Sequence, residues 1–388
     1  MASSSPRSRR RRAYLVGLIL PRQRDDEAEE HLDELAALAD TAGADTVGHG
    51  LQARSAPDPK FLIGRGRGER IAAELSKLGA DLVVFDDDLT GSQTKNLETL
   101  LGVEVLDRSG LILRIFEQRA RSREAKTQVE LARARYELPR LARRWGHLSR
   151  QVGGIGVRGG EGETQLEADR RVLRRRIARL ERDLERIERM RRVQRSGREG
   201  IPVVALAGYT NAGKSTLFNR LAQDGTLAEN RLFATLDSRL RRGALGAKAP
   251  TVVFADTVGF IRKLPHHLVA SFRSTLEEVV AADLVVHVVD RAHPRWEEQK
   301  RVAEEVMAEL GVDPERILTV FNKADLLAAP VALAAGELVV SAVKGTGLAT
   351  LRSALTRRLR SLRVEADEEA AGLELVPQDR SASLFGGR

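Results

Sequence analysis

The stretch Gly208-Tyr-Thr-Asn-Ala-Gly-Lys-Ser215 decides the fold of the C-terminal half of this 388-residue chain. Its pattern, G-x-x-x-x-G-K-S, follows the apolar run Val203–Ala207 and precedes the amphipathic run Thr216–Gln223. A strand, a glycine-rich turn and a helix in this order let backbone N–H groups and the positive helix end converge on phosphate oxygens. The stretch therefore predicts a phosphate-binding loop, with Lys214 on the β- and γ-phosphates and Ser215 on Mg²⁺.

Two segments further along the chain predict the rest of the metal and γ-phosphate contacts. Asp256-Thr-Val-Gly259 follows an apolar run, where the Asp256 carboxylate can hold Mg²⁺ and the Gly259 N–H can sense the γ-phosphate. Thr235 lies between this motif and the phosphate loop, where a switch loop would close on the metal. We therefore expect Ser215, Thr235 and Asp256 to bind Mg²⁺. The predicted catalytic groups are Lys214, Thr235 and Gly259.

Asn322-Lys-Ala-Asp325 predicts the identity of the base. A carboxylate such as that of Asp325 accepts two hydrogen bonds from the N1–H and the amine of guanine, and adenine offers no such donor pair. We expect Asn322 to brace the site, Lys323 to cover the purine face, and Ser341-Ala342 to supply an N–H to the guanine O6. The residues predicted to bind GTP are Gly208, Asn211, Ala212, Gly213, Lys214, Ser215, Thr216, Asp256, Gly259, Asn322, Lys323, Asp325, Ser341 and Ala342.

Phe260 departs from the pattern of many GTPases, which carry Gln at this position to orient the attacking water. A phenyl ring makes no such hydrogen bonds, so intrinsic hydrolysis should be slow. A partner surface or a monovalent cation would then have to position the water. K⁺ is a candidate because Asn211 lies in the phosphate loop, where K⁺-stimulated GTPases carry an Asn. In the alternative, Asn211 only forms hydrogen bonds to the loop backbone.

Residues 13–109 predict a small α/β domain with a mainly parallel sheet, because short apolar runs alternate with amphipathic stretches. The strands expected there are Tyr14–Leu20, Asp45–Val47, Leu82–Phe85 and Val103–Leu106, and the helices are Glu27–Thr41, Gly68–Leu78 and Gln93–Leu101. The strands expected in the GTPase domain, residues 198–363, are Pro202–Ala207, Val252–Ala255, Leu284–Val289, Ile317–Phe321 and Leu338–Val340.

Residues 110–197 predict a helical stem. One helix is expected from Leu111 to Leu138, and a second carries a heptad seam that Arg170 interrupts. Between them, residues 151–163 contain six glycines and predict a loop. The two helices could pair as an antiparallel coiled-coil hairpin. The seam consists of Leu166, Leu173, Ile177, Leu180, Leu184 and Ile187.

The charge distribution predicts a surface that binds a polyanion. Residues 111–200 carry 25 Lys+Arg against 13 Asp+Glu, although the net charge of the whole chain is only +9. Such a local surplus is typical of a surface that faces nucleic acid. The alternative is a solvated coil in which Glu181, Glu185 and Glu188 pair with arginines of the same helix.

Composition sets the remaining expectations. The absence of cysteine excludes disulfides, thiolate metal sites and thiol nucleophiles. No apolar run is long enough for a membrane span, and a cytoplasmic location is expected. We expect a disordered basic N-terminus over residues 1–12 and a disordered acidic tail over residues 364–388.

The motifs resemble those of the HflX GTPases over about residues 14–363. Besides the nucleotide motifs, the resemblance rests on Leu232-Phe-Ala-Thr-Leu-Asp237, Gln128-Val-Glu-Leu-Ala132 and, most specifically, Gly153-Gly-Ile-Gly-Val-Arg-Gly-Gly-Glu-Gly-Glu-Thr-Gln-Leu-Glu167. One departure is Gly64-Arg-Gly-Arg67, where the family often has G-x-G-K; whether the N-terminal domain also binds ATP stays open. Another is Asp237-Ser-Arg-Leu240, which lacks the usual Pro-Thr-Thr.

This resemblance implies a ribosome-associated GTPase, in which an apolar residue such as Phe260 is normal. Members bind the large ribosomal subunit and can split stalled or idle ribosomes under heat or antibiotic stress. The glycine-rich loop and its stem are then implied to reach rRNA, and we expect a monomer whose GTPase the ribosome stimulates. The alternative is a GTP-gated ribosome-assembly or RNA-binding module without splitting activity.

Overall fold

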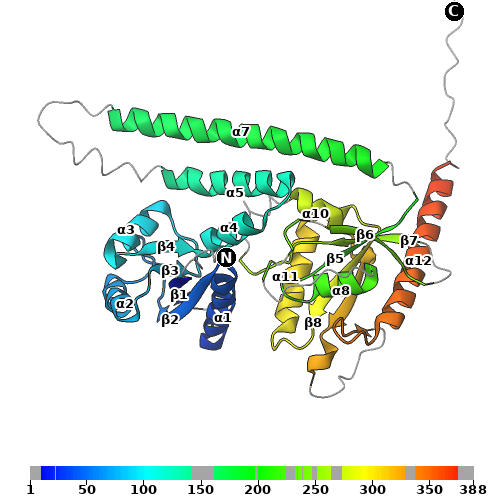
Figure 1. Cartoon of the computed structure of the whole chain (residues 1–388), viewed down its shortest axis with the longest axis horizontal. Helices are drawn as coiled ribbons and strands as arrows, with labels where there is room; N and C mark the ends of the chain where they lie inside the picture. The colour runs from blue at the N-terminus through cyan, green and yellow to red at the C-terminus, as the bar shows by residue number, and fades with distance from the viewer. Residues whose placement is uncertain are drawn as a thin grey trace, which may run out of the picture.

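The chain folds into two α/β units joined by a pair of helices (Figure 1). The computed structural model describes residues 10–21, 23–141, 161–196, 200–222, 232–233, 235–237, 239–246, 251–263, 273–327 and 337–374. The predicted α/β fold class, with a phosphate-loop domain behind an N-terminal α/β unit, is confirmed. None of the described helices combines the length and the apolar character that a membrane span requires.

The elements have the following bounds. The strands are β1 (Arg11–Ile19), β2 (Ala44–Ala53), β3 (Leu82–Phe85), β4 (Glu104–Asp107), β5 (Val203–Ala207), β6 (Arg239–Ala244), β7 (Thr251–Asp256), β8 (Leu284–Asp290), β9 (Ile317–Asn322) and β10 (Leu338–Val339). The α-helices are α1 (Asp25–Thr41), α2 (Arg65–Leu78), α3 (Gly91–Leu101), α4 (Arg108–Arg119), α5 (Arg123–Leu141), α7 (Glu161–Ser196), α8 (Lys214–Ala222), α10 (Arg273–Val280), α11 (Trp296–Glu309) and α12 (Leu348–Glu374). Short 3₁₀ turns span Pro314–Arg316 and Ala324–Leu326.

The N-terminal unit is a parallel sheet in the order β2-β1-β3-β4 with helices on both faces. Alternate residues of β1 lie on opposite faces of the sheet. Ala13 and Leu15 pack with α1 and α4, whereas Tyr14 and Val16 pack with α2 and α3. A sheet covered on both faces needs apolar residues at consecutive positions. This explains why the strands of the unit appear as apolar runs in the sequence.

The C-terminal unit is a sheet in the order β10-β9-β8-β5-β7-β6, in which β6 is antiparallel to β7 and the other neighbours are parallel. Val204 and Leu206 of β5 pack with α8 and α12, and Ala205 and Ala207 pack with α10 and α11. The motif loops leave the carboxyl ends of β5, β7 and β9. That is the edge where doubly wound sheets bind ligands.

The predicted strands agree with the structure to within a few residues, except that β2 is longer than expected and β6 was not predicted. The sequence of β6, Arg-Leu-Arg-Arg-Gly-Ala, has few apolar residues because the strand lies at the edge of the sheet. It is held by its ladder with β7, where Arg239 pairs with Asp256 and Ala244 with Thr251.

The single helix predicted from Leu111 to Leu138 is wrong, because the chain breaks at residues 120–122 into α4 and α5. Leu111, Ile115 and Phe116 of α4 are buried in the N-terminal core, so the stem begins after α4 and not at residue 110. Pro139 does not end α5, which continues to Leu141.

Helices α5 and α7 lie side by side and run in opposite directions (Figure 1). Leu131 of α5 packs against the seam residues Leu180 and Leu184, which are the most buried of the predicted seam. Arg191, near the end of α7, pairs with Glu124 at the start of α5 (2.7 Å). Within the loop predicted over residues 151–163, residues 151–160 lie outside the described residues. Residues 161–163 belong to α7.

Both predicted disordered ends are too long. Arg10 pairs with Asp45 at 2.9 Å, and β1 already begins at Arg11; residues 1–9 lie outside the described residues. At the other end α12 extends to Glu374, ten residues into the predicted tail. The remaining residues of that tail, 375–388, are not described.

His287 is an unusual residue in the apolar strand β8, where its side chain is only 1% exposed. Neither ring nitrogen has a hydrogen-bond partner among the described residues. Burial lowers the pKa of His287 to about 4. In the unfolded chain a histidine titrates near pH 6.5. Below that pH protonation favours the unfolded chain, so stability is lost as the pH falls from 6.5 towards 4.

We expect His287→Leu to remove this acid sensitivity. Between pH 7 and pH 5 the native protein should lose about 2 kcal/mol of unfolding free energy more than the variant. Urea unfolding at the two pH values measures the difference. His49→Leu is the matched control, because the His49 side chain is 54% exposed. Equal pH dependence of His287→Leu and the native protein would contradict the assignment.

Candidate nucleotide-binding site

The phosphate loop lies between β5 and α8, as its motif predicted. Gly208 and Gly213 both have positive φ, and so does Asn211 (φ 61°). A Cβ atom on Gly213 would lie 2.2 Å from Nδ2 of Asn322, so only glycine fits there. The loop is therefore shaped by its glycines and by the base-binding motif behind it.

Lys214 is buried beneath this loop. Its Nζ donates hydrogen bonds to the carbonyl oxygens of Gly208 (3.0 Å) and Tyr209 (2.7 Å). Burial lowers the pKa of Lys214 to about 8, and the nearby Asp256 carboxylate opposes that shift. The ammonium group therefore lies at the concave side of the loop, where a phosphate would compensate its desolvation.

Three oxygen-bearing side chains converge next to Lys214. Ser215 Oγ lies 2.9 Å from Thr235 Oγ1, which donates to Asp256 Oδ2 at 2.9 Å. Asp256 is fully buried, and its Oδ1 has no hydrogen-bond partner among the described residues. Burial raises the pKa of Asp256, although hydrogen bonds from Ser215 and Thr235 and the charge of Lys214 oppose the shift. Hard oxygen donors of this kind fit Mg²⁺.

The switch segment after β7 is held against the phosphate loop by backbone hydrogen bonds. Phe260 N–H donates to Gly208 O (3.0 Å), and Thr210 N–H donates to Phe260 O (2.6 Å). A Cβ atom on Gly259 would lie 2.6 Å from the Thr210 Cα, which explains the glycine. The Phe260 ring is 1% exposed and packs with Leu276 and other residues of the α10–α11 layer. Phe260 is thus a core residue.

The base-binding motif and the Ser341-Ala342 loop lie together at the ends of β9 and β10. Asn322 Nδ2 donates to Ala212 O (2.9 Å), and its Oδ1 accepts from Ala342 N–H (3.0 Å). Ser341 Oγ donates to Asp325 Oδ1 (2.6 Å), and this bond lowers the pKa of the Asp325 carboxyl. Lys323 has positive φ and pairs with Asp290 at 2.7 Å.

The structure thus brings all predicted site residues to one edge of the sheet. Thr216, the last of them, is half-buried in the first turn of α8. Asn211 is exposed, and K⁺ binding at this residue stays a prediction.

A charged network between the two α/β units was not predicted. Tyr209 of the phosphate loop donates its hydroxyl to Glu34 of α1 (2.5 Å) and accepts the Arg262 N–H (2.9 Å). Buried Arg108 binds both Glu34 and Asp86. No sequence motif signals these contacts, because their partners lie up to 175 residues apart. They connect the phosphate loop and the switch segment to the N-terminal unit.

Lys263 completes this network. Its ammonium donates to Asp86 (2.6 Å) and Asp87 (2.8 Å), at the carboxyl end of β3. The pKa of Lys263 is raised, because these two carboxylates outweigh the effect of burial. The segment after Phe260 is therefore fixed to the N-terminal sheet as well as to the phosphate loop.

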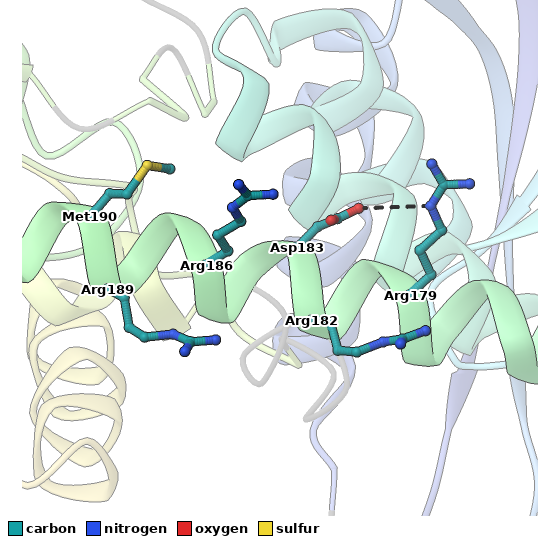
Figure 2. A pocket seen from close by; sticks show the side chains of 6 residues that line it. All are labelled: Arg179, Arg182, Asp183, Arg186, Arg189 and Met190. Atoms are coloured by element: carbon teal, nitrogen blue, oxygen red, sulfur yellow. Dashed lines mark ion pairs between the residues drawn. The ribbon is translucent and has the colours of Figure 1, made fainter.

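The helix α7 presents a separate basic surface. Figure 2 shows Arg182 and Arg189 on one side of the helix and Arg179 and Arg186 on the other. All four are exposed; among the described residues the ion pair of Arg179 with Asp183 (4.0 Å) is the only one they make. The alternative, in which glutamates pair within the helix, does not hold for Glu181, which pairs with Arg135 of α5 (2.8 Å).

Three family models match consecutive parts of the chain. Residues 29–117 match the GTP-binding GTPase N-terminal family, and residues 119–198 match the GTP-binding GTPase Middle Region. Residues 203–323 match the family described as 50S ribosome-binding GTPase. The boundary between the first two coincides with the end of α4, in agreement with the structure.

A solved structure described as the complex of SsGBP with GDP shares the fold, with a TM-score of 0.50 and 25% identity over 91% of this chain and 99% of that one. GTPase HflX of Magnetococcus marinus is 46% identical over 353 residues, which are 89% of this chain and 82% of the relative. GTPase HflX of Escherichia coli K12 is 45% identical over 343 residues, 86% of this chain and 80% of the relative. The resemblance seen in the motifs is thereby confirmed, and the chain belongs to the HflX family of GTPases.

Proposed function

We propose that this GTPase is a cytoplasmic, monomeric factor that binds the large ribosomal subunit in its GTP form and splits stalled or idle ribosomes. The observation that carries the proposal is the combination of a guanine-nucleotide site with a basic helix attached to the same unit. Arg191 of α7 pairs with Glu124 of α5 and lies 3.7 Å from Glu278 of α10, so the stem is tied to the GTPase unit. The family description of residues 203–323 as a 50S ribosome-binding GTPase supports the same partner.

In this mechanism the chain's own residues order the nucleotide. Lys214 and the N–H groups of the phosphate loop bind the phosphates, and Asp325 selects guanine. Ser215, Thr235 and Asp256 would hold Mg²⁺, which neutralises charge on the phosphates when it is bound. Thr235 and Gly259 would close around the γ-phosphate.

Hydrolysis in the free protein should be slow, because the buried Phe260 cannot orient water. We infer that the ribosome supplies the missing group. Hydrolysis then ends the interaction with the subunit, since the closed switch segments lose their γ-phosphate contact.

Sedimentation of ribosomes through a sucrose gradient tests the proposal directly. With the protein and a non-hydrolysable GTP analogue, we expect 70S particles to convert into subunits and the protein to migrate with the large one. GTP turnover should rise by orders of magnitude when ribosomes are added. Lys214→Ala, which should lose nucleotide binding, is the control. Intact 70S particles with bound protein and unstimulated turnover would instead favour the GTP-gated RNA-binding module.

Asp325→Asn tests the choice of base. The Asn side chain replaces one acceptor oxygen by an amide NH₂ group. This donor would face the donating amine of guanine unfavourably, but it could donate to the O2 carbonyl of xanthine. We expect the affinity for GTP to fall by about 100-fold and that for XTP to rise, measured by titration calorimetry. Unchanged preference for GTP over XTP would reject the assignment. The Ser341 hydroxyl, which bonds to Asp325, keeps the side chain in place for either ligand.

Charge reversal on α7 tests the basic surface. We expect Arg182→Glu, Arg186→Glu and Arg189→Glu together to weaken ribosome binding and to reduce the salt dependence of log Kd by about 0.9 for each lost phosphate contact. The matched control reverses three exposed arginines elsewhere, Arg65, Arg301 and Arg316, and changes the net charge equally. If both triple variants alter the slope equally, only overall charge matters and α7 is a solvated helix.

A further inference from the structure

The segment that carries Thr235 also contacts the start of the stem. Two residues after Thr235, the carboxylate of Asp237 accepts the backbone N–H groups of Arg121 (3.1 Å) and Ser122 (3.3 Å) through Oδ2. Its Oδ1 accepts the Ser122 hydroxyl. These groups lie in the break between α4 and α5, 116 and 115 residues away in the sequence.

This contact caps α5 from the other unit. Ser122 Oγ accepts the N–H of Ala125 at 3.0 Å, as a helix N-cap does, and Asp237 in turn fixes that hydroxyl. A negative charge next to the first turn also interacts favourably with the helix dipole. Asp237 therefore completes the start of a helix that would otherwise leave N–H groups unpaired.

Apolar packing holds the same segment against α4 and α5. Leu232, Phe233 and Leu236 are buried in one cluster with residues of both helices. The Phe233 ring meets that of Phe116 edge to face, with centroids 4.8 Å apart. The Phe233 N–H donates to Thr210 Oγ1 (3.0 Å), which joins the segment to the phosphate loop.

Thr235 and Asp237 thus face two different parts of the molecule. Thr235 Oγ1 contacts Ser215 and Asp256, whereas Asp237 contacts the break just before α5. Two residues of chain span no more than about 7 Å, so one side chain moves little without the other. Beyond the cap, α5 packs along α7 through Leu131 and its seam.

We propose that Asp237 is a positioning residue that holds Thr235 at the metal-binding oxygens by anchoring its segment to the first turn of α5. Through this anchor the order of the segment and the order of the α4–α5 break depend on each other. Nucleotide binding then changes the start of the stem, and a force on the stem changes Thr235. The link from the stem to ribosome binding rests on the proposed function; the anchor itself does not.

Asp237→Ala tests the anchor in the protein without nucleotide. We expect hydrogen exchange of the amides at residues 121–126 to accelerate about five- to tenfold, because the cap is lost. With a GTP analogue and Mg²⁺, the native protein should gain protection over the same residues, and the variant should not. Asp283→Ala is the matched control, since Asp283 accepts the Val203 N–H (2.6 Å) in a different part of the GTPase unit.

Steady-state kinetics without ribosomes separate positioning from mere stability. Asp237→Ala should lower kcat about tenfold and raise the Mg²⁺ concentration for half-maximal rate, with little change in the KM for GTP. Asp237→Asn, which keeps one acceptor oxygen, should recover part of this loss. Combining Asp237→Ala with Ser122→Ala should add little to the single change, because both remove one contact.

The outcomes distinguish the two proposals. Unchanged amide exchange at residues 121–126, or a Mg²⁺ midpoint and kcat within twofold of the native values, would overturn the anchor whatever ribosomes do. Additive effects of the two alanine variants would overturn it as well. Failure of ribosomes to stimulate the native protein would overturn the proposed function, and the anchor would still be tested by exchange in the free protein.

Discussion

The buried carboxylate of Asp256 is the constraint on which the nucleotide site depends. A charged group at the end of a central strand is costly to bury unless other groups compensate it. Hydroxyl groups from two distant segments lie beside it. Ser215 Oγ is 2.9 Å from Thr235 Oγ1, which donates a hydrogen bond of 2.9 Å to Asp256 Oδ2. One oxygen of the carboxylate accepts no hydrogen bond from any described residue, so a cation would complete the compensation of its charge. The order of the switch segment is therefore linked to charge in the site.

A second set of buried charges fixes the two α/β units to each other. Arg108 is 3% exposed and pairs with Glu34 and Asp86, while Lys263 reaches Asp86 from the GTPase unit. Such pairs contribute little net stability compared with apolar packing, but removing one partner leaves a buried charge without compensation. These ion pairs consequently favour one relative orientation of the two α/β units over similar orientations. It also places Tyr209 of the phosphate loop in direct contact with the N-terminal unit.

The sequence predicted the parts of this structure that depend on local order. The phosphate loop, the Asp256 turn and the Asn322 turn each follow an apolar strand, and parallel strands bring their carboxyl ends to one edge. The break between α4 and α5 was missed because residues 120–122 contain neither Gly nor Pro, and because Asp237, which fixes the N-cap Ser122, lies 115 residues away. Strand β6 was missed because an edge strand needs few apolar side chains. Contacts over such sequence distances leave no periodic signal.

The environment of Phe260 explains why an anchored switch segment matters in this protein. Where Gln orients the water, a GTPase can make its own chemistry depend on one side chain of the switch segment. In this protein the Phe260 ring at that position is buried in the core between β7 and α10. The Phe260 backbone is hydrogen-bonded to the phosphate loop. Apart from the group that we propose the ribosome supplies, rate control then rests on the placement of the remaining groups, above all Thr235. A segment that holds Thr235 at one end and caps a stem helix at the other makes that placement sensitive to whatever the stem contacts. Loss of the ring's packing, and not of a hydrogen bond, is what a substitution at Phe260 would cost.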